Sequence, residues 1–232
     1  MTTTTTGVAH ALHSVIRRRL DAAARAWFDG ALAAVGPASA PGALLEPFTV
    51  LSRRLGRGAL EMDPAEIAGW RAAGIDWPVA GALDELGRVV LVLHAAARWE
   101  PDTFAPALEA WFRQGDSRER QAILRALPLL PEPERVIALG VEACRSSIQP
   151  VFEAIACENP YPARHFPEPN FNQMVLKALF TGVPLVRIVG LQDRVTAELE
   201  RMARDYASER RAAGRPVPAD IGRLIGAGGI QP

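Results

Sequence analysis

Apolar residues recur every three or four positions along most of this chain, and no stretch sustains the apolar-polar alternation of a half-buried strand. In the clearest segment the recurring positions form one stripe: Val79, Leu83, Leu86, Val90, Leu93 and Ala97. Alanine, leucine and arginine dominate the composition, and these side chains lose little conformational freedom in a helix. The sequence therefore predicts an all-α fold.

Helix starts and links predict how these helices are arranged. Capping boxes stand at 63–66 and 116–119, where an aspartate is followed three residues later by a glutamate. Four short helices are expected at 102–113, 117–127, 132–145 and 148–157. Short links make neighbouring helices antiparallel, as in irregular stacked helical hairpins that form a HEAT-like α-α superhelix. We expect one domain over 1–232, with N-terminal helices in 1–60 and a core array over 80–225.

Charge and composition exclude several classes of protein. The formal net charge is zero, so no overall field attracts nucleic acid. The apolar run 89–97 is far shorter than the roughly 20 residues of a membrane helix, and the first residues lack the pattern of a secretory signal. Cys144 and Cys157 form no CxxC pair and are expected to be buried thiols of a reducing compartment. These features predict a cytoplasmic protein.

Residues 158–169 contain four prolines within ten positions, which forbids a continuous helix because each proline removes an amide donor. We therefore expect a stiff, extended loop. Its hydrogen-bonding and aromatic side chains are unusually dense: Asn159, Tyr161, Arg164, His165 and Phe166. Such a loop either packs across helix ends and satisfies their free carbonyls, or faces a ligand.

The next segment, 170–181, predicts a mostly buried helix with a narrow polar stripe. At 100° per residue, its polar side chains fall within a sector of about 80°, and they are Asn170, Gln173, Lys177 and Thr181. Nearly all other residues of this segment are apolar, so the stripe is expected to face a crevice or another polar segment. Asn172 lies off the stripe and requires a buried partner of its own.

Lys177 is the only lysine among 26 basic residues. A compact ammonium suits a phosphate or carboxylate ligand and, less commonly, a Schiff base. The alternatives are an ion pair with Glu158, Glu168 or Glu209, or chance. A further helix at 195–213 places an apolar stripe toward the core (Val195, Leu199, Met202 and Tyr206), with Glu209 and Arg210 at its borders.

Several of these segments resemble the EboA family. The matching residues are Asn159 to Ala163, Asn172 to Phe180, Gly190-Leu191 with Arg194, Tyr206 to Arg210, and Ala213 to Arg215. The resemblance is sharp over about 146–224 and looser over 80–145, and Phe171 stands where the family pattern has tryptophan. It implies a cytoplasmic protein of the ebo gene cluster, which is linked to making or exporting secondary-metabolite precursors. The resemblance carries over no catalytic residue.

Two hypotheses follow. In the first, the chain is a non-catalytic accessory protein that binds a polar or anionic small molecule, or a partner enzyme of the cluster, through 158–215. The candidate binding residues are Asn159, Tyr161, Arg164, His165, Asn170, Asn172, Gln173, Lys177, Arg194, Glu209 and Arg210. The absence of a phosphate loop, metal-ligand spacing or nucleophile motif favours this reading.

In the second hypothesis, the chain is an enzyme acting on a carbonyl or phosphorylated substrate. Its candidate catalytic residues are Lys177 and His165, with Glu209 as acid or base. His10 and His13 lie three residues apart on a helix, but no carboxylate near them completes a metal site. No metal or cofactor is expected, and the sequence does not fix an oligomeric state.

Overall fold

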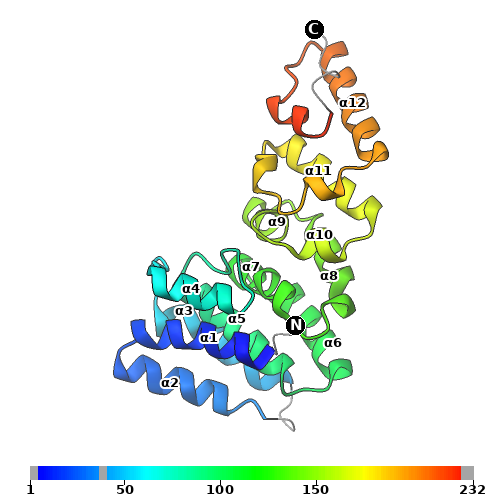
Figure 1. Ribbon diagram of the computed structural model, residues 1–232. Coiled ribbons are helices and arrows are strands. Elements are labelled where there is room, and N and C mark those ends of the chain that lie inside the picture. Colours follow the sequence, from blue (N-terminus) through cyan, green and yellow to red (C-terminus); the bar gives the residue numbers. More distant parts are fainter. Residues whose placement is uncertain (1–4, 37–40, 226–232) are drawn as a thin grey trace. The chain divides into compact units, whose positions relative to one another are not determined.

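The structure is a computed structural model that describes residues 5–36 and 41–225 (Figure 1). The other residues, including 1–4 and 37–40 of the predicted N-terminal helices, lie outside the described ranges. The α-helices are α1 (Thr5–Arg19), α2 (Ala22–Ala33), α3 (Leu45–Leu55), α4 (Pro64–Ala72), α5 (Leu83–Ala96), α6 (Pro101–Gln114), α7 (Ser117–Ala126), α8 (Ile137–Ala143), α9 (Gln149–Ala156), α10 (Tyr161–His165), α11 (Glu168–Thr181) and α12 (Ala197–Ala212). Short 3-10 helices are η1 (Pro41–Leu44), η2 (Leu127–Leu129), η3 (Pro133–Val136), η4 (Leu185–Arg187), η5 (Gln192–Arg194) and η6 (Ala219–Arg223).

The described residues form no strand, and one isolated β-bridge joins Ala59 to Ala82. The all-α prediction is confirmed. The chain divides into two compact units, Met1–Ile155 and Ala156–Pro232, which are described separately below. The HEAT-like stacking and the single domain stay predictions. In the described ranges no helix combines the length and apolar character needed to cross a lipid bilayer.

Helix α5 is the core of the first unit. It packs against α1, α3, α6 and α7, and almost all its side chains are buried, as expected for a helix covered on every side. At Gly87 a Cβ would lie only 2.8 Å from Leu55 Cδ2 and 2.9 Å from Leu51 Cδ2. Glycine therefore allows α3 to approach α5 closely.

A buried ionic network joins α3, α5 and α7. Asp84 is fully buried and Arg88 is 1% exposed. The Asp84 carboxylate accepts hydrogen bonds from Arg88 (3.0 Å), Arg118 (2.7 and 3.1 Å) and the Ser52 hydroxyl (2.9 Å). These donors keep the pKa of Asp84 below its usual value although burial alone acts to raise it. The network fixes the register of three helices.

Helix α4 is held to α1 by one buried carboxylate. Glu66 accepts hydrogen bonds from Arg18 (2.7 and 3.0 Å) and from Arg19 (2.6 and 2.7 Å). It also accepts from the Asp63 amide at 3.1 Å, which completes the predicted capping box at the start of α4. The second predicted capping box, at the start of α7, is likewise present. Both helix starts are confirmed.

Two boundary predictions in the first unit were wrong. The predicted helix 132–145 is split into η3 and α8, because the backbone of Val136 leaves the helical region (φ −118°, ψ 22°) as its side chain turns into the core. Val79 is fully buried but precedes α5, since the segment after Pro78 runs outside any helix until Leu83. Cys144 and Cys157 are buried free thiols, as predicted.

In the second unit, α12 packs against α11. The buried side chains of α12 are Leu199, Ala203 and Ala207, whose steps of four residues form one narrow face. The predicted stripe was therefore partly wrong: Leu199 is buried, but Val195, Met202 and Tyr206 are only half-buried. The buried face of α12 is thus made mainly of small side chains, and the larger apolar ones are partly accessible.

Candidate functional site

The proline-rich segment begins with a fixed turn. Glu158 has a positive φ of 48°. Its amide donates to the Arg187 carbonyl (2.8 Å), and its carboxylate pairs with the Arg187 guanidinium (2.8 and 3.0 Å). Asn159 is 2% exposed, and its Oδ1 accepts a hydrogen bond from the Tyr161 amide at 2.9 Å. These contacts hold the chain at the entry to α10.

The prediction of an extended loop over 158–169 was wrong in part, because α10 forms one helical turn within it. Pro162 occupies the first turn, where a helix needs no amide donor from that residue. Tyr161 is fully buried, and its ring lies 4.9 Å from the His165 ring and 6.0 Å from the Phe166 ring. His165 is half-buried and Arg164 is exposed. Tyr161 thus belongs to the core of the unit.

Arg194 connects α10 to α11. Its guanidinium donates to the Ala163 carbonyl (2.5 Å) and the Phe166 carbonyl (2.8 Å), and it lies 4.6 Å from the centre of the Phe171 ring. Gly190, with φ of 71°, approaches so closely that a Cβ there would lie 2.8 Å from Ala163 Cβ. Arg194 therefore satisfies carbonyls at the end of α10, which is a structural role for one predicted binding residue.

Helix α11 begins at Glu168, two residues before the predicted start, because Pro169 is compatible with a first helical turn. Of the predicted polar stripe, Gln173 and Thr181 are exposed, and Asn170 and Lys177 are half-buried. The side chains of Phe171, Asn172, Met174, Val175, Leu176, Ala178 and Leu179 are buried. A mostly buried helix with one narrow accessible stripe is what the pattern predicted.

Asn172 lies on the buried side of α11, at 1% exposure. Its Oδ1 has no hydrogen-bond partner among the residues that the structure describes. The buried partner expected from the sequence is therefore missing for this oxygen.

One accessible residue of α11 was not among the predicted site residues. Phe180 is 58% exposed and shares its sector of the helix with Gln173 and Lys177. Its ring lies 4.6 Å from the ring of Tyr206 on α12, and the guanidinium of Arg210 lies 5.9 Å from that tyrosine. Arg210 also donates to the Pro216 carbonyl at 3.0 Å, which holds it in place. We call the following five residues the α11/α12 face: Gln173, Lys177, Phe180, Tyr206 and Arg210.

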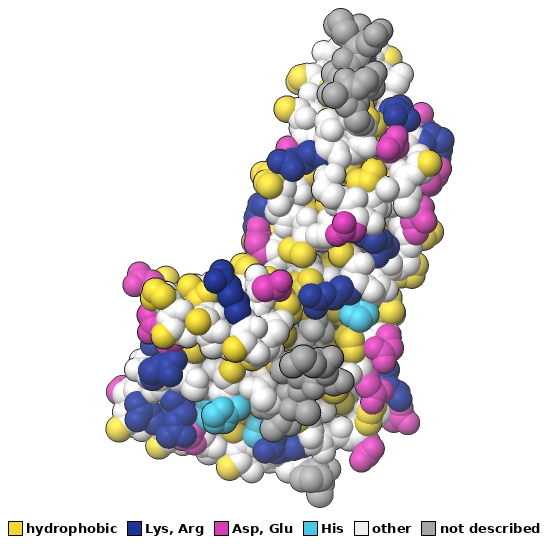
Figure 2. Space-filling view, in the orientation of Figure 1, with side chains coloured by type: hydrophobic (Ala, Val, Ile, Leu, Met, Phe, Trp, Pro, Cys, Tyr) yellow, Lys and Arg dark blue, Asp and Glu magenta, His cyan; other side chains and the backbone are white. Residues whose placement is uncertain are grey.

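The position of Phe180 around the helix could have predicted its exposure from the sequence. Its position falls inside the stripe, but its apolar side chain led to the assumption that it is buried. On the side of the second unit that Figure 2 shows, acidic and basic side chains are interspersed rather than gathered by sign. The α11/α12 face itself combines two aromatic rings, Phe180 and Tyr206, with a cation, Arg210.

The candidate catalytic residues occupy three helices: His165 lies on α10, Lys177 on α11 and Glu209, which is exposed, on α12. Their catalytic roles stay predictions. Two of the carboxylates considered as partners for Lys177 make other contacts, since Glu158 pairs with Arg187 and Glu168 accepts from the Thr196 hydroxyl at 2.9 Å.

Within residues 5–36 and 41–225, no three His, Cys, Asp or Glu side chains are grouped to hold a metal ion. A carboxylate does lie beside His13, but it does not complete a group of three with His10. Asp29 of α2 is 3.2 Å from the Nε2 of His13. Burial lowers the pKa of His13, although Asp29 acts in the opposite direction.

Comparison with known proteins identifies one family. The family model described as metabolite traffic protein EboA matches residues 8–226, which is nearly the whole chain and includes both units. No curated protein and no solved structure shows a significant match.

Proposed function

Because the chain belongs to the family of the metabolite traffic protein EboA, we propose that it is a non-catalytic accessory protein that binds a partner protein through the α11/α12 face. The observation that supports this most is the exposure of Phe180, at 58%. Exposed phenylalanine contributes little to the stability of the unit itself. A ring that stands out from a helix fits a recess on another protein better than it lines a pocket of its own.

The neighbours of Phe180 favour a protein partner. Tyrosine, phenylalanine and arginine are enriched at the centres of protein interfaces, and here Phe180, Tyr206 and Arg210 form one contiguous cluster. Because Arg210 is anchored on the Pro216 carbonyl, this cluster loses little conformational freedom on binding. Lys177 lies on the same sector of α11. A complementary partner has an apolar recess bordered by acidic groups.

The test is affinity purification from cells that also produce the proteins encoded beside this gene. Tagged wild-type chain is compared with Phe180→Ser and with Leu45→Ser, which removes a 40% exposed apolar side chain from the first unit. We expect a neighbouring gene product to be retained by the wild type and by Leu45→Ser, and to be lost from Phe180→Ser. Truncating an interface hot spot weakens binding by about 2 kcal/mol or more, roughly thirtyfold.

Equal retention by all three proteins contradicts the proposal, as does equal loss from both variants. Both substitutions change surface residues, so they are expected to leave the free energy of unfolding within about 0.5 to 1 kcal/mol of the wild type. Urea unfolding of each purified variant checks this directly.

A further inference from the structure

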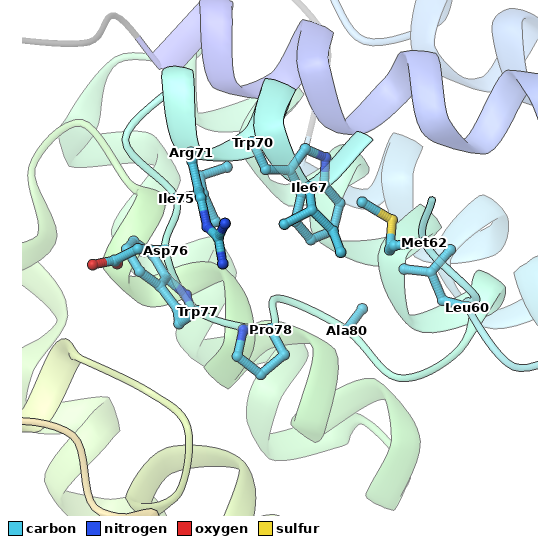
Figure 3. Close-up of a pocket in the computed structure, with 10 residues that line it drawn as sticks. All are labelled: Leu60, Met62, Ile67, Trp70, Arg71, Ile75, Asp76, Trp77, Pro78 and Ala80. Carbon is cyan, nitrogen blue, oxygen red and sulfur yellow. The ribbon is translucent and has the colours of Figure 1, made fainter. Parts of the chain in front are cut away.

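A pocket of about 290 Å³ lies in the first unit, beside α4 (Figure 3). Its lining residues come from α4 and the segments on either side of it: Leu60, Met62, Ile67, Trp70, Arg71, Ile75, Asp76, Trp77, Pro78 and Ala80. The volume is close to the lower end of the range for small-molecule sites, about 300 to 1,000 Å³. No residue of the α11/α12 face takes part in this pocket.

The walls are apolar and well ordered by contacts of their own. Ile75 is 2% exposed, Trp70 6% and Trp77 9%, so these side chains are fixed by packing. The two flanking segments are joined where the Leu60 amide donates to the Gly81 carbonyl at 3.0 Å. The hydrogen bonds of Glu66 hold α4 itself against α1. The pocket is therefore formed before any ligand arrives.

Two polar groups of the lining residues lack a protein partner in the described ranges: the guanidinium of Arg71, which is exposed, and the indole N–H of Trp70, which is buried. The guanidinium of Arg71 extends toward the hollow, whereas the Asp76 carboxylate points away from it (Figure 3). Arg71 forms no ion pair with any residue in the described ranges. The indole Nε1 of Trp70, a residue 94% buried, likewise has no hydrogen-bond acceptor among them. Arg71 is therefore the cationic group that the pocket offers to a ligand.

We propose that this pocket binds a small amphipathic anion, whose apolar body lies among Trp70, Ile75 and Trp77 and whose carboxylate or phosphate pairs with Arg71. The apolar walls select the body because they exclude water from it. Arg71 selects the head group, since a guanidinium forms two parallel hydrogen bonds with either anion. The chemistry differs from that of the α11/α12 face, and the site does not depend on it.

The probe is octanoate, with 1-octanol as the uncharged ligand of equal chain length. Binding is followed by the ¹H–¹⁵N signals of the indole groups, because two of the five tryptophans line the pocket and the other three do not. We expect octanoate to shift the Trp70 and Trp77 signals while those of Trp27, Trp99 and Trp111 stay in place. Octanol is expected to bind the same two positions more weakly.

Substitutions separate the head group from the apolar body. Arg71→Gln is expected to weaken octanoate binding about tenfold, the effect of losing a hydrogen bond to a charged group, and to leave octanol binding unchanged. The matched control is Arg53→Gln on α3, which is exposed and outside the pocket. Ala80→Leu fills the pocket and is expected to abolish binding of both probes, whereas Ala68→Leu, on the exposed side of α4, has no effect.

The proposal is overturned if octanoate, at concentrations below those at which it aggregates, shifts neither the Trp70 nor the Trp77 indole signal. It is also overturned if Arg71→Gln weakens the binding of octanoate and octanol equally. An equal loss of affinity in Arg53→Gln also contradicts it, because the attraction is then a general charge effect. Phe180→Ser is expected to bind octanoate as the wild type does. Failure of the pocket and failure of the proposed protein interface are thus separate results.

Discussion

Replacing Glu66 by glutamine tests whether one carboxylate attaches α4 to the rest of the first unit. The side chain of Glu66 is 4% exposed and receives hydrogen bonds from two arginines and its own cap. The hydrogen bonds from Arg19, and then those from Arg18, lower its pKa to about 2, even though burial acts in the opposite direction. Glutamine keeps the shape of the side chain and removes the charge.

The pKa gives the magnitude of the effect. A decrease from 4.5 to about 2 corresponds to roughly 3 kcal/mol of unfolding free energy, at about 1.4 kcal/mol for each tenfold change in the ionisation constant. The folded state has the lower pKa, so this stability is fully present above about pH 4.5. It is lost as the pH falls through about 2. At pH 3 roughly half should remain.

The assay is urea unfolding at pH 7 and pH 3, together with hydrogen exchange of the α4 amides at pH 7. Glu66→Gln should reduce the unfolding free energy by about 3 kcal/mol at pH 7 and by about half as much at pH 3. Glu61→Gln, an exposed glutamate in the adjacent segment, is the matched control and should change neither. A loss of less than about 0.5 kcal/mol in Glu66→Gln at pH 7, or an equal loss at both pH values, would refute a stabilising role for the Glu66 charge.

Three further substitutions test contacts within each of the two units. Asp84→Asn should destabilise the first unit by about 3 kcal/mol in urea unfolding, because it removes the charge that compensates the buried Arg88; a value below about 1 kcal/mol contradicts this. Gly190→Ala should reduce the free energy of unfolding of the second unit by about 2 kcal/mol and so lower its melting temperature, because the new Cβ meets Ala163 and the positive φ disfavours alanine. An unchanged melting temperature would show that the contact relaxes freely. Arg194→Met should cost about 2 kcal/mol and accelerate hydrogen exchange in α10, whose carbonyls it leaves unpaired, and unaltered exchange argues against the clamp.

Local signals predicted helix starts well and longer-range arrangements poorly. The capping boxes at Asp63 and Asp116 were found because each involves residues only three positions apart. The α10 turn was missed because four prolines forbid a continuous helix over 158–169 but do not forbid a single turn. Pro162 is compatible with that turn, since it lies at its start. The burial of the Asp84 carboxylate was missed as well. Arg88 is only four residues away, but Ser52 and Arg118 are 32 and 34 residues away, and only the folded chain brings them to Asp84.

In the candidate site, too, local patterns were predicted and contacts between distant segments were not. The polar stripe of α11 follows from helical periodicity, so Gln173 and Lys177 were predicted to share a side of the helix. Periodicity does not say which elements cover an apolar side chain, and the exposure of Phe180 depends on where α12 crosses α11. The pocket beside α4 lay outside the segment 158–215 to which sequence reasoning assigned function, because its lining carries no motif and is assembled by the turns on either side of the helix.

The single lysine allows the most direct test of the proposed interface. Reductive methylation with ¹³C-formaldehyde keeps the positive charge and places a labelled dimethylamine at Lys177 and at the chain's α-amino group, two signals that are resolved by their chemical shifts. Adding the protein recovered by affinity purification is predicted to shift or broaden the Lys177 signal with wild-type chain and to leave it unchanged with Phe180→Ser. If that protein binds both forms equally while the Lys177 signal does not move, the interface lies elsewhere and the account given for the α11/α12 face is wrong.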